Sequence, residues 1–247
     1  MPSAFRRLVS SDWNECLAPC GPFDVITFHH PQLRADLEVV FRQYTGNVIT
    51  LAAAVQRIQT LLPGPITREQ MDAYLEQDFQ TYRNVPQLIQ ACLERNILFM
   101  INTTGMIGYF QRLLARALLP PLPALSAHPL VRYTAGRVDP PLVYELRRIG
   151  DKPVHTEMAA RQYGIPRRDI VIIGDSGGDG PHFAWGAKVG ARLVGSMIKP
   201  SLARYCAQQG IIIDHRFGHT YTEGQAKAVE AEMGYDFMAL LEIIDQA

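Results

Sequence analysis

From residue 85 onward, helical patterns alternate with short apolar runs, and this alternation constrains the fold more than any other feature. Three of these runs read "ILFMI" (97–101), "IVIIG" (170–174) and "ARLVG" (191–195). Runs of this kind are typical of parallel strands whose sheet is covered by helices on both faces. The sequence therefore predicts a Rossmann-like, doubly wound α/β fold with a parallel sheet.

The segment 25–84 interrupts this alternation. Apolar residues recur there at spacings of three and four, and "ITREQM" begins with a capping box formed by Thr67 and Gln70. The pattern predicts three successive helices with no strand between them. We therefore expect an α/β core with an all-helical insert near its start.

Charge and cysteine content narrow the class of protein. Lysine plus arginine and aspartate plus glutamate each number 24, so the formal net charge is zero and nucleic acid is not an expected partner. No run of about 18 apolar residues predicts a membrane span, and the N-terminus lacks a signal-peptide pattern. The four cysteines form no CxxC pair, which argues against zinc. We expect a reduced, cytoplasmic protein, and the oligomeric state stays open.

The stretch "GDSGGD" (174–179) permits two interpretations. It differs by one residue from the sequence around the nucleophilic serine of chymotrypsin-like proteases, which would make Ser176 a nucleophile. Alternatively, Asp175 and Asp179 hold a metal. Chymotrypsin-like enzymes are β-barrels whose catalytic histidine and aspartate precede the serine. Here helices and strands alternate, and no convincing histidine context lies upstream, so the sequence favours the metal.

Polar residues follow the predicted strands at the edge where open α/β sheets bind ligands. Asp12 follows the first strand, Thr103 the second, and Asp175 and Asp179 the third, while Lys152 lies just before the helix that leads into the third strand. Carboxylates suit a hard cation such as Mg²⁺, and a lysine can shield further negative charge. One of the carboxylates could instead attack phosphorus as a nucleophile.

This arrangement resembles the haloacid dehalogenase superfamily, whose members are mostly phosphatases. Four motifs match in order along the whole chain: "DWNECL" (12–17), Thr103, Lys152 and "GDSGGD". The resemblance implies that Asp12 is the nucleophile and that Thr103 and Lys152 assist it. It also implies that Mg²⁺ is held by Asp12, the backbone carbonyl of Asn14 and Asp175, with Asp179 supporting the metal and its waters. The helical insert lies where that family carries a helical cap. The resemblance therefore implies a small all-helical cap domain at 25–84, inserted into an α/β core that comprises residues 1–24 and 85–247.

The first motif departs from the family pattern at Asn14, where a second aspartate is usual. In the family this aspartate protonates the leaving group and then activates water, and an amide can do neither. Losing a general acid/base typically costs about 10²–10⁴-fold in rate. Three explanations stay open: Glu15 or a cap residue supplies the proton, the leaving group needs no acid, or the protein is a weak or inactive relative.

The sequence thus predicts a magnesium-dependent phosphohydrolase that acts on a small phosphorylated metabolite through an aspartyl-phosphate intermediate. The alternative is a catalytically weak or inactive relative that binds a phosphorylated ligand or a protein partner, and Asn14 is the residue that favours it. Two ring side chains lie in or just after these motifs, Trp13 in the first and His182 after the fourth. We expect His182 to be a packing residue and Trp13 to line the entrance below the cap.

Overall fold

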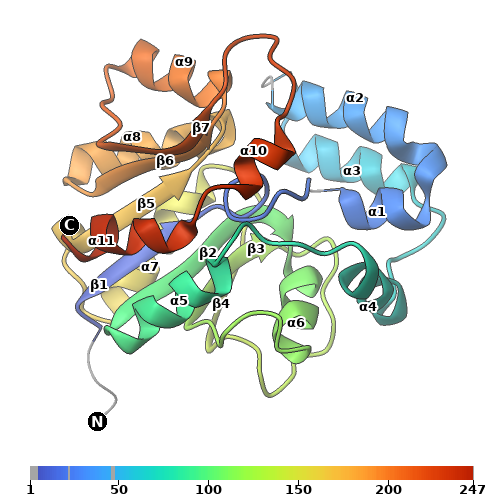
Figure 1. The fold of residues 1–247 in the computed structure, drawn as a ribbon. Coiled ribbons are helices and arrows are strands. Elements are labelled where there is room, and N and C mark those ends of the chain that lie inside the picture. The colour runs from blue at the N-terminus through green and yellow to red at the C-terminus, as the bar shows by residue number, and fades with distance from the viewer. Residues whose placement is uncertain (1–4, 22, 46–47, 247) are drawn as a thin grey trace.

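The computed structural model describes residues 5–21, 23–45 and 48–246 (Figure 1). Seven strands form one sheet in the order β4-β3-β2-β1-β5-β6-β7, and every neighbouring pair is parallel. The predicted parallel α/β fold is therefore confirmed. The strands are β1 (Arg7–Ser11), β2 (Ile97–Met106), β3 (Ala124–His128), β4 (Leu142–Glu145), β5 (Ile170–Gly174), β6 (Arg192–Ile198) and β7 (His215–Thr220).

Helices cover both faces of this sheet, as Figure 1 shows: α5 and α11 lie in front of it and α7, α8 and α9 behind it. Successive residues of a strand point to opposite faces, so Ile170 and Ile172 of β5 pack in one apolar cluster while Val171 and Ile173 pack in the other. The helices are α1 (Asp24–His29), α2 (Arg34–Thr45), α3 (Leu51–Leu61), α4 (Arg68–Gln77), α5 (Val85–Glu94), α6 (Ile107–Ala115), α7 (Asp151–Gln162), α8 (Gly180–Val189), α9 (Pro200–Gln209), α10 (Val229–Met233) and α11 (Leu240–Asp245).

The order of the strands reverses at β1. From β1 the chain adds β2, β3 and β4 on one side, and then β5, β6 and β7 on the other. Ser11, the last residue of β1, lies opposite Ile101 of β2 and Ile173 of β5. Ligands of open α/β sheets bind beyond the carboxyl ends of the strands at such a reversal. The residues that follow β1 and β5, together with the end of β2, therefore form the expected ligand-binding site.

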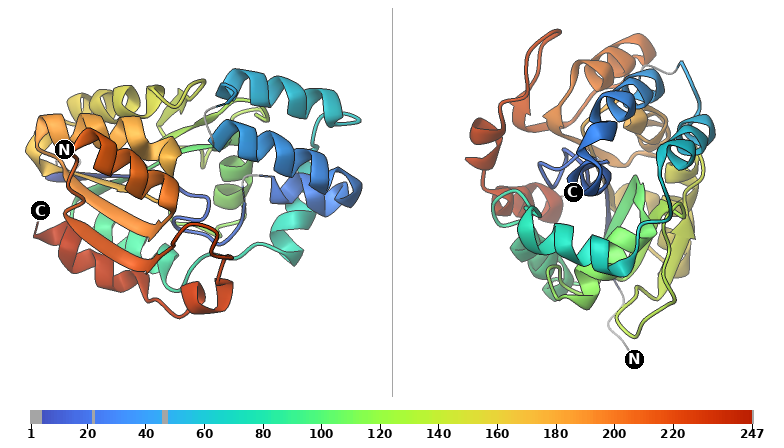
Figure 2. Two further views of the ribbon diagram at one scale, coloured as in Figure 1. Left: turned by 90° about the horizontal axis from the view of Figure 1, so that it is seen from above. Right: turned by 90° about the vertical axis from the view of Figure 1, so that its right-hand side faces the viewer.

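The helices α1–α4 lie together beyond one end of the sheet rather than on either face (Figures 1 and 2). Within 23–45 and 48–84 the structure contains helices and turns but no strand. The predicted capping box is present, because the Thr67 hydroxyl accepts from the Gln70 amide and the Gln70 side chain accepts from the Thr67 amide. Leu37 and Tyr74 of these helices belong to the same apolar cluster as Val9 of β1, so the helices pack against the sheet layers through apolar contacts.

Four details of the sequence-based prediction differ from the structure. The apolar run "IIID" (211–214) predicts a strand, but the strand begins at His215, and Ile211 and Ile213 instead pack against the cluster behind the sheet. The pattern of the tail, 223–247, predicts helix throughout, yet the described part contains the short helices α10 and α11 with a break between them. The edge strand β4 and the six-residue helix α1 were not predicted, because both are too short for a periodic pattern.

Membrane spans and cysteines can also be checked. None of the helices in the described part of the chain combines the length and the hydrophobicity that crossing a bilayer requires. The four cysteines are all buried and form no disulfide.

Candidate active site

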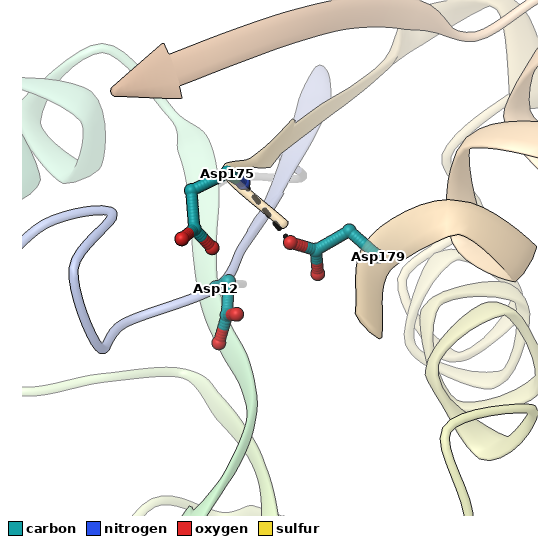
Figure 3. A group of neighbouring side chains, drawn as sticks. All are labelled: Asp12, Asp175 and Asp179. Carbon is teal, nitrogen blue, oxygen red and sulfur yellow. Dashed lines mark hydrogen bonds between the residues drawn. The ribbon is translucent and has the colours of Figure 1, made fainter. Parts of the chain in front are cut away.

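Three acidic side chains meet where the strand order reverses. Asp12 follows β1, Asp175 follows β5, and Asp179 begins the turn into α8 (Figure 3). One oxygen from each carboxylate lies within 4.8 Å of the others. Asp175 and Asp179 are each only 1% exposed. The Asp12 amide donates a 2.9 Å hydrogen bond to the carbonyl of Ile173, which keeps the chain extended past the end of β1.

Asp179 organises the loop of the "GDSGGD" motif. Its Oδ2 accepts hydrogen bonds from the backbone amides of Asp175 at 3.0 Å and Ser176 at 3.3 Å, the first of which is drawn in Figure 3. A Cβ at Gly174 would lie 2.6 Å from the Asp179 carboxyl carbon, so only glycine permits this approach. Ser176 and Asp179 form a capping box, and within the described chain Ser176 makes no hydrogen bond to a histidine. The structure thus offers no support for Ser176 as a nucleophile.

Lys152 connects two of the acids. Its ammonium lies 2.6 Å from Asp179 Oδ1 and 3.2 Å from Asp12 Oδ2. It was expected just before a helix, but it is the second residue of α7, and it is only 1% exposed. The Asn102 amide donates a 2.9 Å hydrogen bond to the Lys152 carbonyl, which fixes the start of α7 against β2. Burial opposes the charged lysine, but the two carboxylates outweigh it and raise the pKa of Lys152.

Replacing this lysine should be costly. Lys152→Met removes the cation from a buried pair and leaves two carboxylates uncompensated, so we expect the free energy of unfolding to fall by about 3–5 kcal/mol. Urea denaturation of both proteins measures the difference. The matched control is Lys188→Met on the exposed face of α8, for which a change within about 0.5 kcal/mol is expected. Equal stability of the two variants would contradict the proposed role of Lys152.

A second charged network was not predicted from the sequence. Lys199, directly after β6, lies 2.8 Å from Asp175 Oδ2 and also forms an ion pair with Glu15. Lys227 contacts the other oxygen of Glu15 at 2.9 Å. Burial works against ionisation of Glu15, yet Lys199 and Lys227 together lower its pKa. Glu15 has a φ of 57°, an unusual backbone conformation for this residue type. The sequence signals Lys199 only by its place after a strand, and it does not indicate that this strand pairs with β5.

The first motif and Thr103 meet beside the acids. Thr103 lies within β2, where its hydroxyl accepts from the Gly105 amide at 3.2 Å and also hydrogen-bonds Asp12. The Asn14 amide nitrogen lies 3.4 Å from the Cys20 carbonyl, and its oxygen faces the backbone of Gly105. The structure therefore brings Asn14, Thr103 and Asp12 to the same edge of the sheet.

Burial changes the acidity of the site. It raises the pKa of Asp12, although Lys152 opposes the shift, and it raises the pKa of Asp175 to about 8, with Lys199 acting in the opposite direction. Both oxygens of Asp175 are buried. Lys199 contacts Oδ2 at 2.8 Å, but neither oxygen accepts a hydrogen bond of good geometry within the described residues. Buried carboxylates that face one another and keep free oxygen lone pairs suit a hard cation with oxygen ligands. The residues at this position therefore fit Mg²⁺.

His182 and Trp13 both serve packing. His182 is buried, hydrogen-bonds the Thr156 hydroxyl at 2.9 Å, and has its pKa lowered by burial to about 3. It is thus a neutral packing residue, as expected. Trp13 was expected to line the entrance, but it is fully buried, with its ring edge-on to Tyr109 and Phe110. Its side chain belongs to the same apolar cluster as Val9 of β1 and does not reach the surface.

No protein-family model matches this sequence, and no curated protein sequence matches it either. Solved structures, however, show that the chain has the fold of the phosphatases and hydrolases of the haloacid dehalogenase superfamily, as the sequence predicted.

Two structures of phosphoserine phosphatase illustrate the likeness. One is substrate-bound (14% identity, TM-score 0.68) and the other is a phospho-aspartyl intermediate analogue (13% identity, TM-score 0.66), and each match covers 96% of this chain and 98% of that one. A HAD family hydrolase from Salmonella enterica is 14% identical with a TM-score of 0.64, over 96% of this chain and 71% of its own. At these identities the likeness concerns the fold.

Proposed function

We propose that the protein is a magnesium-dependent phosphohydrolase that cleaves a small phosphorylated metabolite through an aspartyl-phosphate at Asp12. The observation that carries the proposal is the cluster of Asp12, Asp175 and Asp179, with Lys152 between two of them, at the reversal of the strand order. The phosphatase folds among the similar structures support it. They do not favour the alternative of a non-catalytic module.

In this proposal Mg²⁺ would be held by Asp12, the Asn14 backbone carbonyl and Asp175. Asp179, which already binds Lys152 and two loop amides, would keep these ligands in place. Bound Mg²⁺ would neutralise negative charge on the phosphoryl group during transfer. Lys199 supplies part of the positive charge beside Asp175 in this structure.

The chain's own residues can perform the transfer. An Asp12 oxygen attacks phosphorus, the bond to the leaving oxygen breaks, and that oxygen takes up a proton from water. The Lys152 ammonium, 3.2 Å from Asp12, would stabilise the charge that develops, and the Thr103 hydroxyl would donate to a phosphoryl oxygen. Water then cleaves the acyl phosphate, which releases phosphate and restores Asp12. Asn14 can neither give nor accept the protons of these steps.

We further propose that residues 25–84 act as the cap of this enzyme, closing over the site, excluding water and selecting the substrate. Their helices α1–α4 lie together beyond one end of the sheet, as Figure 2 shows. Residues 1–24 and 85–247 would then form the catalytic core.

A panel of small phosphate monoesters, beginning with p-nitrophenyl phosphate, tests the proposal with and without Mg²⁺. We expect turnover that depends on Mg²⁺ and falls by more than about 10²-fold after chelation, because charge stabilisation by the metal is worth several kcal/mol. Restoring Mg²⁺ should restore the rate, which controls for damage by the chelator. Binding of phosphate with Mg²⁺ but without any hydrolysis would instead select the non-catalytic alternative.

A further inference from the structure

Tyr44, near the end of α2, brings a hydroxyl from the helical segment to the acidic site. A Cβ added at Gly178, in the loop between Asp175 and Asp179, would lie 4.0 Å from this hydroxyl oxygen. The ring packs against the apolar cluster in front of the sheet, so its position is fixed by contacts. Tyr44 is therefore a residue of the predicted cap that reaches the loop of the fourth motif.

The surroundings of this hydroxyl are those of the site itself. Burial raises the pKa of Tyr44 to about 12, Lys152 and the Thr104 hydroxyl act to lower it, and Asp12 and Asp179 add to the increase. The hydroxyl thus stays neutral at physiological pH and can donate a hydrogen bond. These electrostatic effects of the lysine and two of the acids agree with the nearness of the hydroxyl to Gly178.

The hydroxyl oxygen is buried, and within the described residues it has no hydrogen-bond partner of good geometry, although the Thr104 hydroxyl is nearby. Buried hydroxyl groups are nearly always satisfied, because leaving one without a partner costs stability. An unpaired hydroxyl at a candidate active site is explained if a bound ligand accepts its hydrogen bond.

We propose that the Tyr44 hydroxyl donates a hydrogen bond to a phosphoryl oxygen of the substrate and so couples the helical segment to the reacting group. This inference rests on the proposed function. A neutral donor suits an anionic oxygen, and this hydroxyl lies near Gly178, in the loop that joins Asp175 and Asp179, while Lys152 lies 3.2 Å from Asp12. The sequence did not single out Tyr44.

Inorganic phosphate is the probe for this contact. We compare wild type, Tyr44→Phe and Tyr133→Phe by calorimetric titration with phosphate in the presence of Mg²⁺, and by kcat and KM for p-nitrophenyl phosphate. Tyr133 is the matched control, because its hydroxyl donates a 2.9 Å hydrogen bond to the Thr67 carbonyl at the joint between the helical segment and the core. Both variants therefore lose one tyrosine hydroxyl from the same boundary.

Tyr44→Phe should weaken phosphate binding by about 10-fold to 100-fold, as expected for a hydrogen bond to a charged group, while Tyr133→Phe stays within about twofold of wild type. Unchanged binding in Tyr44→Phe, or no phosphate binding by wild type, would overturn the inference. If phosphate binding falls in Tyr44→Phe but wild type hydrolyses nothing, the contact stands and the proposed hydrolysis fails. If wild type hydrolyses and Tyr44→Phe has an unchanged kcat/KM, the contact fails and the hydrolysis stands.

Discussion

Asp12→Asn is expected to reduce phosphatase turnover by about 10⁴-fold or more, because an amide cannot form the acyl phosphate that the proposed reaction requires. The substitution keeps the shape of the side chain and the Trp13 amide contact of 2.7 Å, so the protein should still fold. Steady-state assays measure the loss. Acid quenching during turnover of a ³²P-labelled substrate should trap label on wild type but not on the variant.

Ser176→Ala is the variant that separates the two interpretations of "GDSGGD". Its side chain takes part in the capping box with Asp179, so a small loss of stability is expected, with turnover within about threefold of wild type. If Ser176→Ala lost turnover while Asp12→Asn kept full activity, the nucleophile would be Ser176. That result would refute the mechanism proposed for Asp12.

Asn14→Asp is expected to raise kcat by about 10²-fold to 10⁴-fold, the usual contribution of a general acid and base. The amide nitrogen of Asn14 now lies 3.4 Å from the Cys20 carbonyl, and its oxygen faces the Gly105 backbone. A carboxyl in this place would meet a carbonyl oxygen, which favours its protonated form and so suits an acid that protonates a leaving group. The measurement is kcat over a pH series for both proteins.

The control is Asn96→Asp, which makes the same chemical change directly before β2, at the end of that strand away from Thr103. This variant should leave kcat unaltered. No gain from Asn14→Asp, with its stability in urea preserved, would show that the reaction does not use an acid at this position. The proton would then come from another group, or the natural leaving group would need none.

The sheet could be predicted because its strands are apolar on both faces, as in "IVIIG", and because helical periodicity separates them. The errors arose where local pattern and packing disagree. Ile211 and Ile213 are apolar like strand residues, but they cover the back of the sheet from a loop. β4 is an edge strand whose residues are all half-buried, so its sequence lacks the continuous apolar signal.

The acids of the candidate site could be predicted because each follows a strand, and the topology of parallel sheets brings such residues together. Lys199 and Tyr44 could not. Lys199 follows a strand as well, but only the pairing of β6 with β5 places it beside Asp175. Tyr44 is one of several ring side chains on the helical segment, and no periodicity indicates which of them reaches the core.

The loop of the first motif depends on a residue from the far end of the chain. Lys227, which binds Glu15, comes 212 residues after it, whereas all three acids of the cluster come before Lys199. When Asp179 leaves the exit tunnel of the ribosome during synthesis, all three acids are therefore outside it. Lys199 and Lys227, which balance the charge of Glu15, have not yet emerged. Charge balance at this loop is therefore among the last features acquired during synthesis, and the C-terminal tail belongs to the site although it contributes none of the acids.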